Sequence, residues 1–309
     1  MTRIRHVLPV LIALLCVGVP TWVAATRWST LTTGHPAYPV LLGALALAGV
    51  AIGIRAGRAG TTPPGRRSPL RVVGRVAATV GIVGVAALAV WLRPYPADPV
   101  AVAATAASRS VDVVGGATAW ELRPRGGAVE GVVFFPGALV DPRAYLALLR
   151  PLAEQGALVV VVKPPLNLAL LAPDVGGVLD RHPEVQDWVV GGHSLGGVPA
   201  ASAAARADDD ARVRGLLLWA SYPAQDISAA PVAAASVSGD RDGLATPSDI
   251  AASRVLLPSD TAFTVVRGGV HAFFGDYGPQ AGDGEPGTTR ADAQRQIVDA
   301  TAALLARVG

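Results

Sequence analysis

At residues 188–196 the chain reads Trp-Val-Val-Gly-Gly-His-Ser-Leu-Gly. The apolar run Trp188–Val190 predicts a buried strand, and the Ala-rich stretch Gly196–Ala205 predicts a helix. Between them, Gly192-His193-Ser194-Leu195-Gly196 matches G-x-S-x-G in the strand-turn-helix setting that this motif requires. Glycines are needed beside the serine because its backbone is strained and flanking side chains would clash with the neighbouring strand and helix. The stretch therefore predicts Ser194 as a nucleophile at a helix N-terminus, where developing negative charge is favoured.

The chain around this stretch alternates between short apolar runs and helical patterns. The run Ala157–Val162 is unbroken apolar, as a parallel strand buried on both faces should be. We predict strands at 110–114, 118–122, 131–135, 157–162, 188–190, 215–220, 232–237 and 263–266, and helices after Asp141-Pro142, at 196–205, at 247–253 and from Arg290. This order predicts an α/β fold with a mainly parallel sheet and helices on both faces, and ligands bind at the carboxyl ends of such strands.

The N-terminal part has a different composition. The 309 residues are 51% hydrophobic and only 16% charged, with a mean hydropathy of +0.43. Up to Arg93 there are ten Arg and no acidic residue, and the first acid is Asp98. The low share of charged residues and the high share of hydrophobic residues in the whole chain exclude a disordered chain and a Lys- and Arg-rich nucleic-acid module. The single cysteine, Cys16, excludes a disulfide framework and a cysteine-based zinc site.

Three uncharged apolar stretches, 7–25, 37–54 and 76–92, are close to the minimum length that crosses a bilayer. They predict an all-α transmembrane region over 1–93, a linker over 94–109 and a catalytic domain over 110–309. Alternatively, the first stretch is a signal peptide with Val23-Ala24-Ala25 as its cleavage site. Six Arg lie between Arg55 and Arg75. The positive-inside rule therefore places this loop in the cytoplasm and everything after Leu92 outside the cell membrane.

Three stretches resemble the α/β-hydrolase superfamily: F-F-P-G-A-L-V-D-P-R-A-Y at 134–145, G-G-H-S-L-G-G at 191–197 and G-G-V-H-A-F-F-G-D-Y-G at 268–278. The resemblance covers roughly 111–308 and is strongest to a small bacterial branch of serine hydrolases, akin in size to the dienelactone hydrolases. Dienelactone hydrolases use a cysteine nucleophile, whereas this chain has Ser194, so their substrate is not carried over.

The superfamily order of catalytic residues is serine, acid, histidine. Of the five histidines only His271 follows Ser194, so it is the expected base. Asp240 and Asp242 both follow the predicted strand 232–237. The resemblance favours Asp242 as the acid, which leaves Asp240 as a turn-stabilising side chain. The acid would hold the tautomer of the imidazole and stabilise the imidazolium.

The resemblance also implies an oxyanion hole made of two backbone N–H groups. One belongs to Leu195, directly after the nucleophile. The other is expected from Ala138, with Leu139 as the alternative. Lys163 and Tyr222 follow predicted strands at the same edge as Ser194, so both are candidates for substrate binding. The alternative for Lys163 is a solvated residue at a strand end.

Other features narrow the expected function. About eleven residues, 221–231, separate two predicted strands at the point where relatives insert a lid, so no lid domain is expected. The sequence contains no P-loop, dinucleotide fingerprint or metal-spaced histidine cluster, and we expect no cofactor and no metal. The prediction is a membrane-anchored serine hydrolase that cleaves a small-molecule carboxylic ester or thioester through an acyl-enzyme. The alternatives are an acyltransferase with an alcohol or cell-wall acceptor and a non-catalytic membrane-proximal binding domain. The expected partners are the ester and the lipid bilayer, with no nucleic acid.

Overall fold

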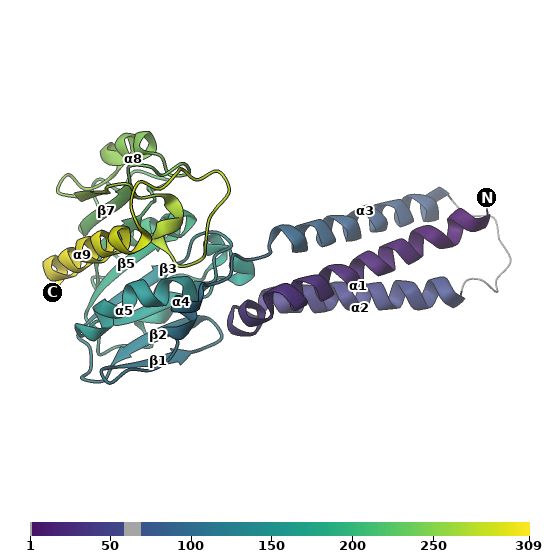
Figure 1. Cartoon of the computed structure of the whole chain (residues 1–309), viewed down its shortest axis with the longest axis horizontal. Coiled ribbons are helices and arrows are strands. Elements are labelled where there is room, and N and C mark those ends of the chain that lie inside the picture. The colour runs from purple at the N-terminus through teal and green to yellow at the C-terminus, as the bar shows by residue number, and fades with distance from the viewer. Residues whose placement is uncertain (1, 59–68) are drawn as a thin grey trace. The chain divides into compact units, whose positions relative to one another are not determined.

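A computed structural model of the chain describes residues 2–58 and 69–309. It divides into two compact units, one comprising Met1–Thr32 with Pro36–Pro94 and the other Thr33–His35 with Tyr95–Gly309 (Figure 1). The elements of the first unit are α1 (Thr2–Thr33), α2 (Ala37–Arg58) and α3 (Pro69–Trp91). The helices of the second unit are α4 (Pro99–Ala103), α5 (Leu146–Glu154), α6 (Gly176–Leu179), α7 (Gly197–Ala204), α8 (Pro247–Ser253) and α9 (Arg290–Val308). Its strands are β1 (Val111–Gly115), β2 (Ala119–Pro124), β3 (Glu130–Phe135), β4 (Leu158–Val162), β5 (Asp187–His193), β6 (Val213–Trp219), β7 (Ala233–Gly239) and β8 (Ala262–Val266).

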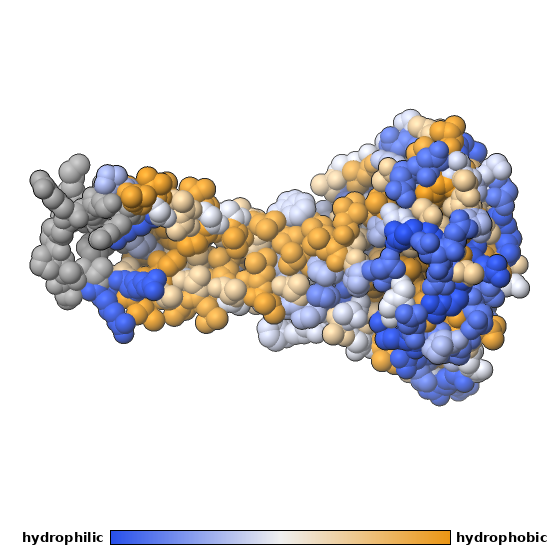
Figure 2. Space-filling view, turned by 180° about the vertical axis from the view of Figure 1, so that it is seen from behind, coloured by the Kyte–Doolittle hydropathy of each residue, from blue (hydrophilic) through white to orange (hydrophobic). Residues whose placement is uncertain are grey.

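The described residues of the first unit include three helices that are long and apolar enough to cross a membrane. Their candidate spans are Val7–Thr33, Ala37–Arg58 and Val72–Trp91, each overlapping one predicted stretch. Hydrophobic side chains cover much of the surface of this unit, as Figure 2 shows, and Leu14, Leu47 and Val80 are among those exposed. Such a surface is unfavourable in water and favourable in lipid.

The helix α1 extends beyond the predicted stretch 7–25. Arg27 lies within it, at a break where its backbone has φ −139° and ψ 25°. Its guanidinium donates to the carbonyl of Pro94 at 2.9 Å, so Arg27 binds the segment that follows α3 in the same unit. In α2, Tyr38 is buried and donates its hydroxyl to the Ala89 carbonyl at 2.6 Å. The Thr-Pro-Pro-Gly stretch at Thr62–Gly65 lies outside the described residues.

Within the described residues, the second unit is built on one eight-stranded sheet with the order β1-β2-β4-β3-β5-β6-β7-β8. The β1–β2 and β2–β4 pairs are antiparallel, and all pairs from β4 to β8 are parallel. The strands β1 and β2 form a hairpin, in whose turn Gly116 donates its N–H to the Ala119 carbonyl at 2.9 Å. The predicted fold class, an α/β-hydrolase sheet preceded by apolar helices, is confirmed.

The sheet is buried on both faces by helices. In β3, Val132 and Phe134 belong to the core shared with α5 and α9, whereas Val133 and Phe135 belong to the core shared with α6 and α7. This alternation is the two-residue period of a strand, and it explains why the strands are apolar throughout. The sheet is therefore a rigid platform, and its carboxyl edge carries the loops described below.

Residues 94–109, predicted as a linker, are packed into the second unit from Tyr95 onward. Tyr95 donates its N–H to the Leu139 carbonyl at 2.7 Å, and its own carbonyl accepts from Asp141 N at 3.0 Å. Asp98 then forms an ion pair with Arg290 at 2.6 Å. The Pro- and Ala-rich composition gave no sign of these contacts, because most of them are made by backbone groups that every residue carries.

Candidate active site

Ser194 lies at the turn between β5 and α7, in the short helix η5 (Ser194–Gly196). Its backbone is in the left-handed region at φ +52°, a conformation that is costly for a residue with a side chain. A Cβ at Gly192 would collide with the carbonyl of Gly196, and one at Gly196 would collide with the carbonyl of Phe135. Glycine is therefore required on both sides of the serine, and the structure has the strained turn that the motif predicts.

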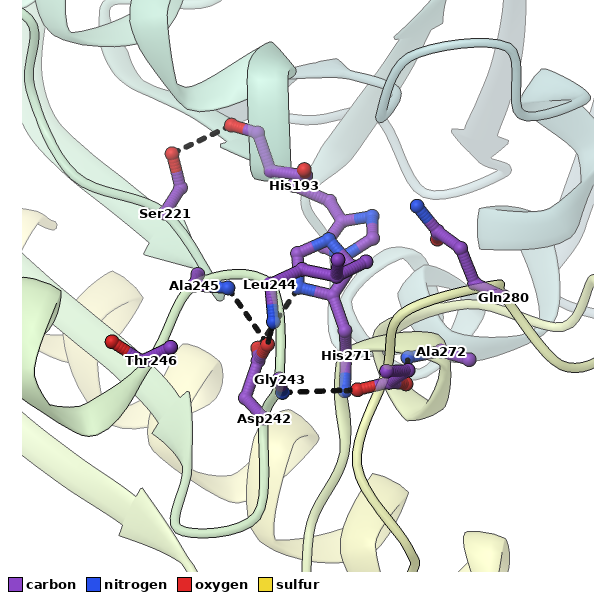
Figure 3. Close-up of polar contacts among 12 residues, drawn as sticks. His193, Ser221, Asp242, Gly243, Leu244, Ala245, Thr246, His271, Ala272 and Gln280 are labelled. Atoms are coloured by element: carbon purple, nitrogen blue, oxygen red, sulfur yellow. Dashed lines mark hydrogen bonds and ion pairs between the residues drawn. The ribbon is translucent and has the colours of Figure 1, made fainter.

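Asp242 and His271 lie together at the carboxyl edge of the sheet. Asp242 follows β7, and His271 opens the short helix η7 (His271–Phe274) after β8. Oδ2 of Asp242 lies 2.9 Å from Nδ1 of His271, and both side chains are buried (Figure 3). The other oxygen of Asp242 accepts the N–H groups of Leu244 and Ala245, both at 2.8 Å. These bonds orient the carboxylate toward the imidazole.

Asp240, the alternative acid, has a different partner. Its Oδ1 accepts the N–H of Gly268 at 2.7 Å, and no hydrogen bond to His271 is found for it in the part of the chain that the structure describes. Asp240 therefore joins the loop after β7 to the loop after β8 through the backbone. This contact matches the turn-stabilising interpretation of Asp240.

His271 Nε2 is buried and has no hydrogen-bond partner among the described residues. The Ser194 hydroxyl is therefore not hydrogen-bonded to it here. The two groups are nevertheless in one neighbourhood, because the ring of His193, directly before Ser194, lies 4.6 Å from the ring of His271. In unliganded hydrolases the bond between nucleophile and base is often long and shortens only with substrate.

The loop after β3 supplies the candidate oxyanion donors, and its N–H groups have distinct uses. Gly137 donates to the hydroxyl of Tyr145 at 2.9 Å, and Leu139 donates to the carbonyl of Asn167 at 2.8 Å. For Ala138 no acceptor is found within the described residues. Leu195 lies in the first turn of η5, where N–H groups have no acceptor within the helix. The geometry thus leaves Ala138 and Leu195 available to a ligand, while Leu139 is already bonded.

His193 forms a buried network beside Ser194. Its Nδ1 lies 2.9 Å from the hydroxyl of Tyr145. Because that hydroxyl accepts the Gly137 N–H, we assign its proton to the bond with His193. Burial lowers the pKa of His193 well below its usual value, and the neighbouring His271 lowers it further. His193 is therefore neutral.

Lys163 lies at the end of β4 but is not a solvated residue. It is buried, its ammonium group donates to the Gly116 carbonyl at 2.6 Å, and it lies 4.3 Å from the centre of the Trp120 ring. Burial lowers its pKa to about 8, although the nearby Asp141 carboxylate opposes this shift. The prediction of a solvated strand-end residue is wrong. The role of Lys163 in substrate binding stays a prediction.

Tyr222, the other candidate for substrate binding, follows β6 by three residues and is 40% exposed. Its neighbour Ser221 is more closely tied to the site, because its hydroxyl donates to the Ser194 carbonyl at 2.6 Å. No hydrogen bond of the Tyr222 side chain is found among the described residues, and its role in substrate binding stays a prediction.

Sequence reasoning missed Tyr145, Asn167 and Asp283. Tyr145 contributes through its side-chain hydroxyl, and Asn167 contributes through its backbone carbonyl. The carboxylate of Asp283 accepts backbone N–H groups of Gly243, His271 and Ala272. The only local signal for it is the turn-like Gly282-Asp283-Gly284.

A mainly parallel sheet whose central strand ends in a strained serine turn, with an aspartate–histidine pair at the same edge, defines the α/β-hydrolase architecture. The chain belongs to the alpha/beta hydrolase family, whose model matches residues 131–296.

Solved structures with similarity to this chain include Thermogutta terrifontis esterase 2 phosphonylated by sarin. It has 12% sequence identity and a TM-score of 0.48, with 65% of this chain and 96% of that chain covered. Another is a dienelactone hydrolase-like promiscuous phosphotriesterase, P91, from metagenomic libraries. It has 19% identity and a TM-score of 0.43, with 63% of this chain and 97% of that chain covered. Among curated proteins no match was found.

Proposed function

We propose that this protein is a membrane-anchored serine hydrolase that cleaves carboxylic esters or thioesters. In this proposal Ser194 is the nucleophile, His271 the general base and Asp242 the carboxylate that orients it. The observation that carries the proposal is the 2.9 Å contact of Asp242 with His271 Nδ1, which leaves the buried Nε2 unpartnered in the neighbourhood of the serine turn.

The reaction follows from these positions. Nε2 of His271 takes the proton of the Ser194 hydroxyl as its oxygen attacks the carbonyl carbon. The N–H groups of Ala138 and Leu195 donate to the oxyanion, and each such donor contributes about 2.7–4 kcal/mol to the transition state. The imidazolium then gives its proton to the leaving alcohol or thiol, and an acyl-enzyme remains. Water, deprotonated by His271, releases the acid and restores the serine.

The membrane part of the proposal rests on α1, α2 and α3 and on the placement of arginine. The candidate spans carry apolar surface along their length, and six Arg lie between Arg55 and Arg75. With this loop in the cytoplasm, the N-terminus is inside and the catalytic unit is extracytoplasmic. Residues 1–93 then form the membrane region and residues 110–309 the catalytic domain.

The experiment that tests the catalytic proposal is labelling of membranes with a fluorophosphonate, which reacts covalently with activated serines. The wild-type chain is expected to be labelled, and Ser194→Ala is expected to lose the label. A matched control is Ser202→Ala, which removes a serine from α7 and leaves the turn unchanged. Equal labelling of the wild type and Ser194→Ala would exclude Ser194 as the nucleophile.

A further inference from the structure

The segment 280–287 is wedged between the loop that carries Asp242 and the loop that carries His271. Gly287 donates its N–H to the Gly268 carbonyl at 2.9 Å. A Cβ at Gly243 would approach the backbone of Gly282 and Gly284 to within 2.6 and 2.8 Å, and one at Gly284 would collide with the Arg241 carbonyl. Glycine at these positions lets the backbone of this segment approach the acid loop closely. The residue between Gly282 and Gly284 is Asp283.

The carboxylate of Asp283 is surrounded by backbone donors from both loops. Its Oδ1 accepts Gly243 N at 3.2 Å and His271 N at 3.0 Å, and its Oδ2 accepts Ala272 N at 2.8 Å. Oδ1 also accepts the N–H of the adjacent Gly284 at 2.8 Å. Figure 3 shows Gly243, His271 and Ala272 close together, and the N–H groups of all three donate to the Asp283 carboxylate. Hydrogen bonds to an ionised acceptor are about twice as strong as neutral ones, and a carboxylate fits several donors at once.

We propose that Asp283 is a positioning residue that locks the acid loop to the base loop, an inference that rests on the proposed function. Gly243 directly follows Asp242, and the other bonds go to the backbone of His271 itself and of its neighbour Ala272. Asp283 thus binds the main chain of the residue directly after the acid and the main chain of the base itself. Without it, the two loops remain joined by the Asp242–His271 contact, by Asp240 and by the bond from Arg241 N to the Gly269 carbonyl at 3.0 Å. None of these contacts is made by the main chain of His271.

Asp283 should therefore matter for the relative positions of the catalytic groups more than for substrate affinity. Asp283 uses its carboxylate on the backbone and has no described contact with Ser194 or the oxyanion loop. Its loss is expected to let the imidazole shift relative to the serine. A displacement of about 1 Å at a catalytic group can cost about 10²-fold in rate. The effect should fall on kcat and leave KM within about threefold.

The test uses the full chain in detergent micelles and hydrolysis of a p-nitrophenyl ester. Asp283→Ala is expected to lower kcat about 10²-fold. Because Asp283→Ala leaves these backbone N–H groups without an acceptor, formate should bind to them and raise kcat of this variant at least about tenfold, with a saturable dependence on formate concentration. In Asp283→Asn the amide side chain occupies the same space, so this variant should retain partial activity and should not respond to formate. Asp260→Ala is the control, since Asp260 pairs at the surface with Arg307 and its loss should change neither kcat nor the response to formate.

A second measurement does not depend on activity. The Nδ1 proton of His271 in its bond to Asp242 should give a downfield proton resonance, assigned by its absence in Asp242→Ala. It should weaken or vanish in Asp283→Ala and persist in Asp260→Ala. If the wild type neither hydrolyses esters nor reacts with fluorophosphonate, the proposed function fails while this resonance still decides the role of Asp283. A folded Asp283→Ala variant with wild-type kcat, or one that keeps the resonance unchanged, would overturn the inference. If Asp283→Ala does not fold, wild-type kcat and an unchanged resonance in Asp283→Asn would overturn it equally.

Discussion

The hydroxyl of Tyr145 lies 2.9 Å from Nδ1 of His193 and joins the loop after β3 to the turn that carries Ser194. The same hydroxyl accepts the N–H of Gly137 at 2.9 Å, so that one buried oxygen holds the residue before Ala138 and the residue before Ser194. A tyrosine at the start of a helix thus sets the spacing between the attacking group and the groups that would receive the oxyanion.

Tyr145→Phe is expected to lower both stability and kcat. The variant leaves the buried Gly137 N–H without an acceptor, which costs about 1–3 kcal/mol of unfolding free energy. The loop that carries Ala138 is then free to shift, which lowers kcat more than it changes KM. Denaturant unfolding and steady-state kinetics measure the two effects. Thr301→Val is the matched control, because its buried hydroxyl accepts from Trp219 and donates to the Ile297 carbonyl, and not to the loop after β3. Wild-type kcat in Tyr145→Phe would contradict the role given to this hydroxyl.

Asp242→Asn and Asp240→Asn are expected to separate the two candidate acids. Asp242→Asn removes the acceptor that holds the imidazole tautomer, and such a change lowers kcat about 10⁴-fold in serine enzymes. Asp240→Asn keeps an oxygen for the Gly268 N–H and should lower kcat less than about tenfold. The measurement is kcat for one ester at one pH with both variants in parallel. Equal losses would mean that the contact between Asp242 and His271 is not the catalytic one.

Ser194→Gly is expected to be more stable than Ser194→Ala, while both are inactive. The left-handed backbone at φ +52° costs a side-chain-bearing residue about 1–2 kcal/mol, and glycine avoids this cost. Glycine loses more backbone entropy on folding, about 0.5–1 kcal/mol, so the net gain should be about 1 kcal/mol. Comparing the denaturation midpoints of these two variants isolates the backbone effect from the loss of the hydroxyl. A lower midpoint for Ser194→Gly would show that the turn is not strained.

Lys163 predicts a pH dependence of stability. Its pKa in the folded chain is about 8, below the value of 10.5 for an ordinary lysine. Between these pH values the unfolded chain binds more protons, so the free energy of unfolding should rise with pH across this window. Lys163→Met has no such group, and Lys163→Arg stays charged throughout. The unfolding free energy of the wild type relative to either variant should therefore increase from about pH 8 to about pH 10.5. If this difference in unfolding free energy did not change with pH, burial would not lower the pKa of the Lys163 ammonium group.

The membrane orientation is testable with fusions at two positions. A reporter that is active only outside the cytoplasm should be inactive when fused after Arg58 and active when fused after Gly309. A reporter that is active only in the cytoplasm should give the opposite pattern. Activity of one reporter at both positions would contradict an extracytoplasmic catalytic unit.

The sequence by itself determined the order of elements, because strand and helix periods and the glycines around Ser194 are local properties. It also singled out His271 by elimination, since the other histidines precede the serine. Its choice of Asp242 depended on a resemblance to relatives, because Asp240 and Asp242 lie in the same turn and differ only in which way the backbone directs their side chains.

Only the tertiary structure decided which polar groups meet. The burial of Lys163 against Trp120, the use of Leu139 N–H by Asn167 and the packing of residues 95–104 all depend on segments that are distant in sequence. The same is true of Asp283, which binds the backbone of two loops, whereas its local sequence Gly282-Asp283-Gly284 indicates only a turn. Nearly every residue carries the same backbone donor and acceptor. The sequence therefore cannot indicate which of these backbone groups a given side chain will bind.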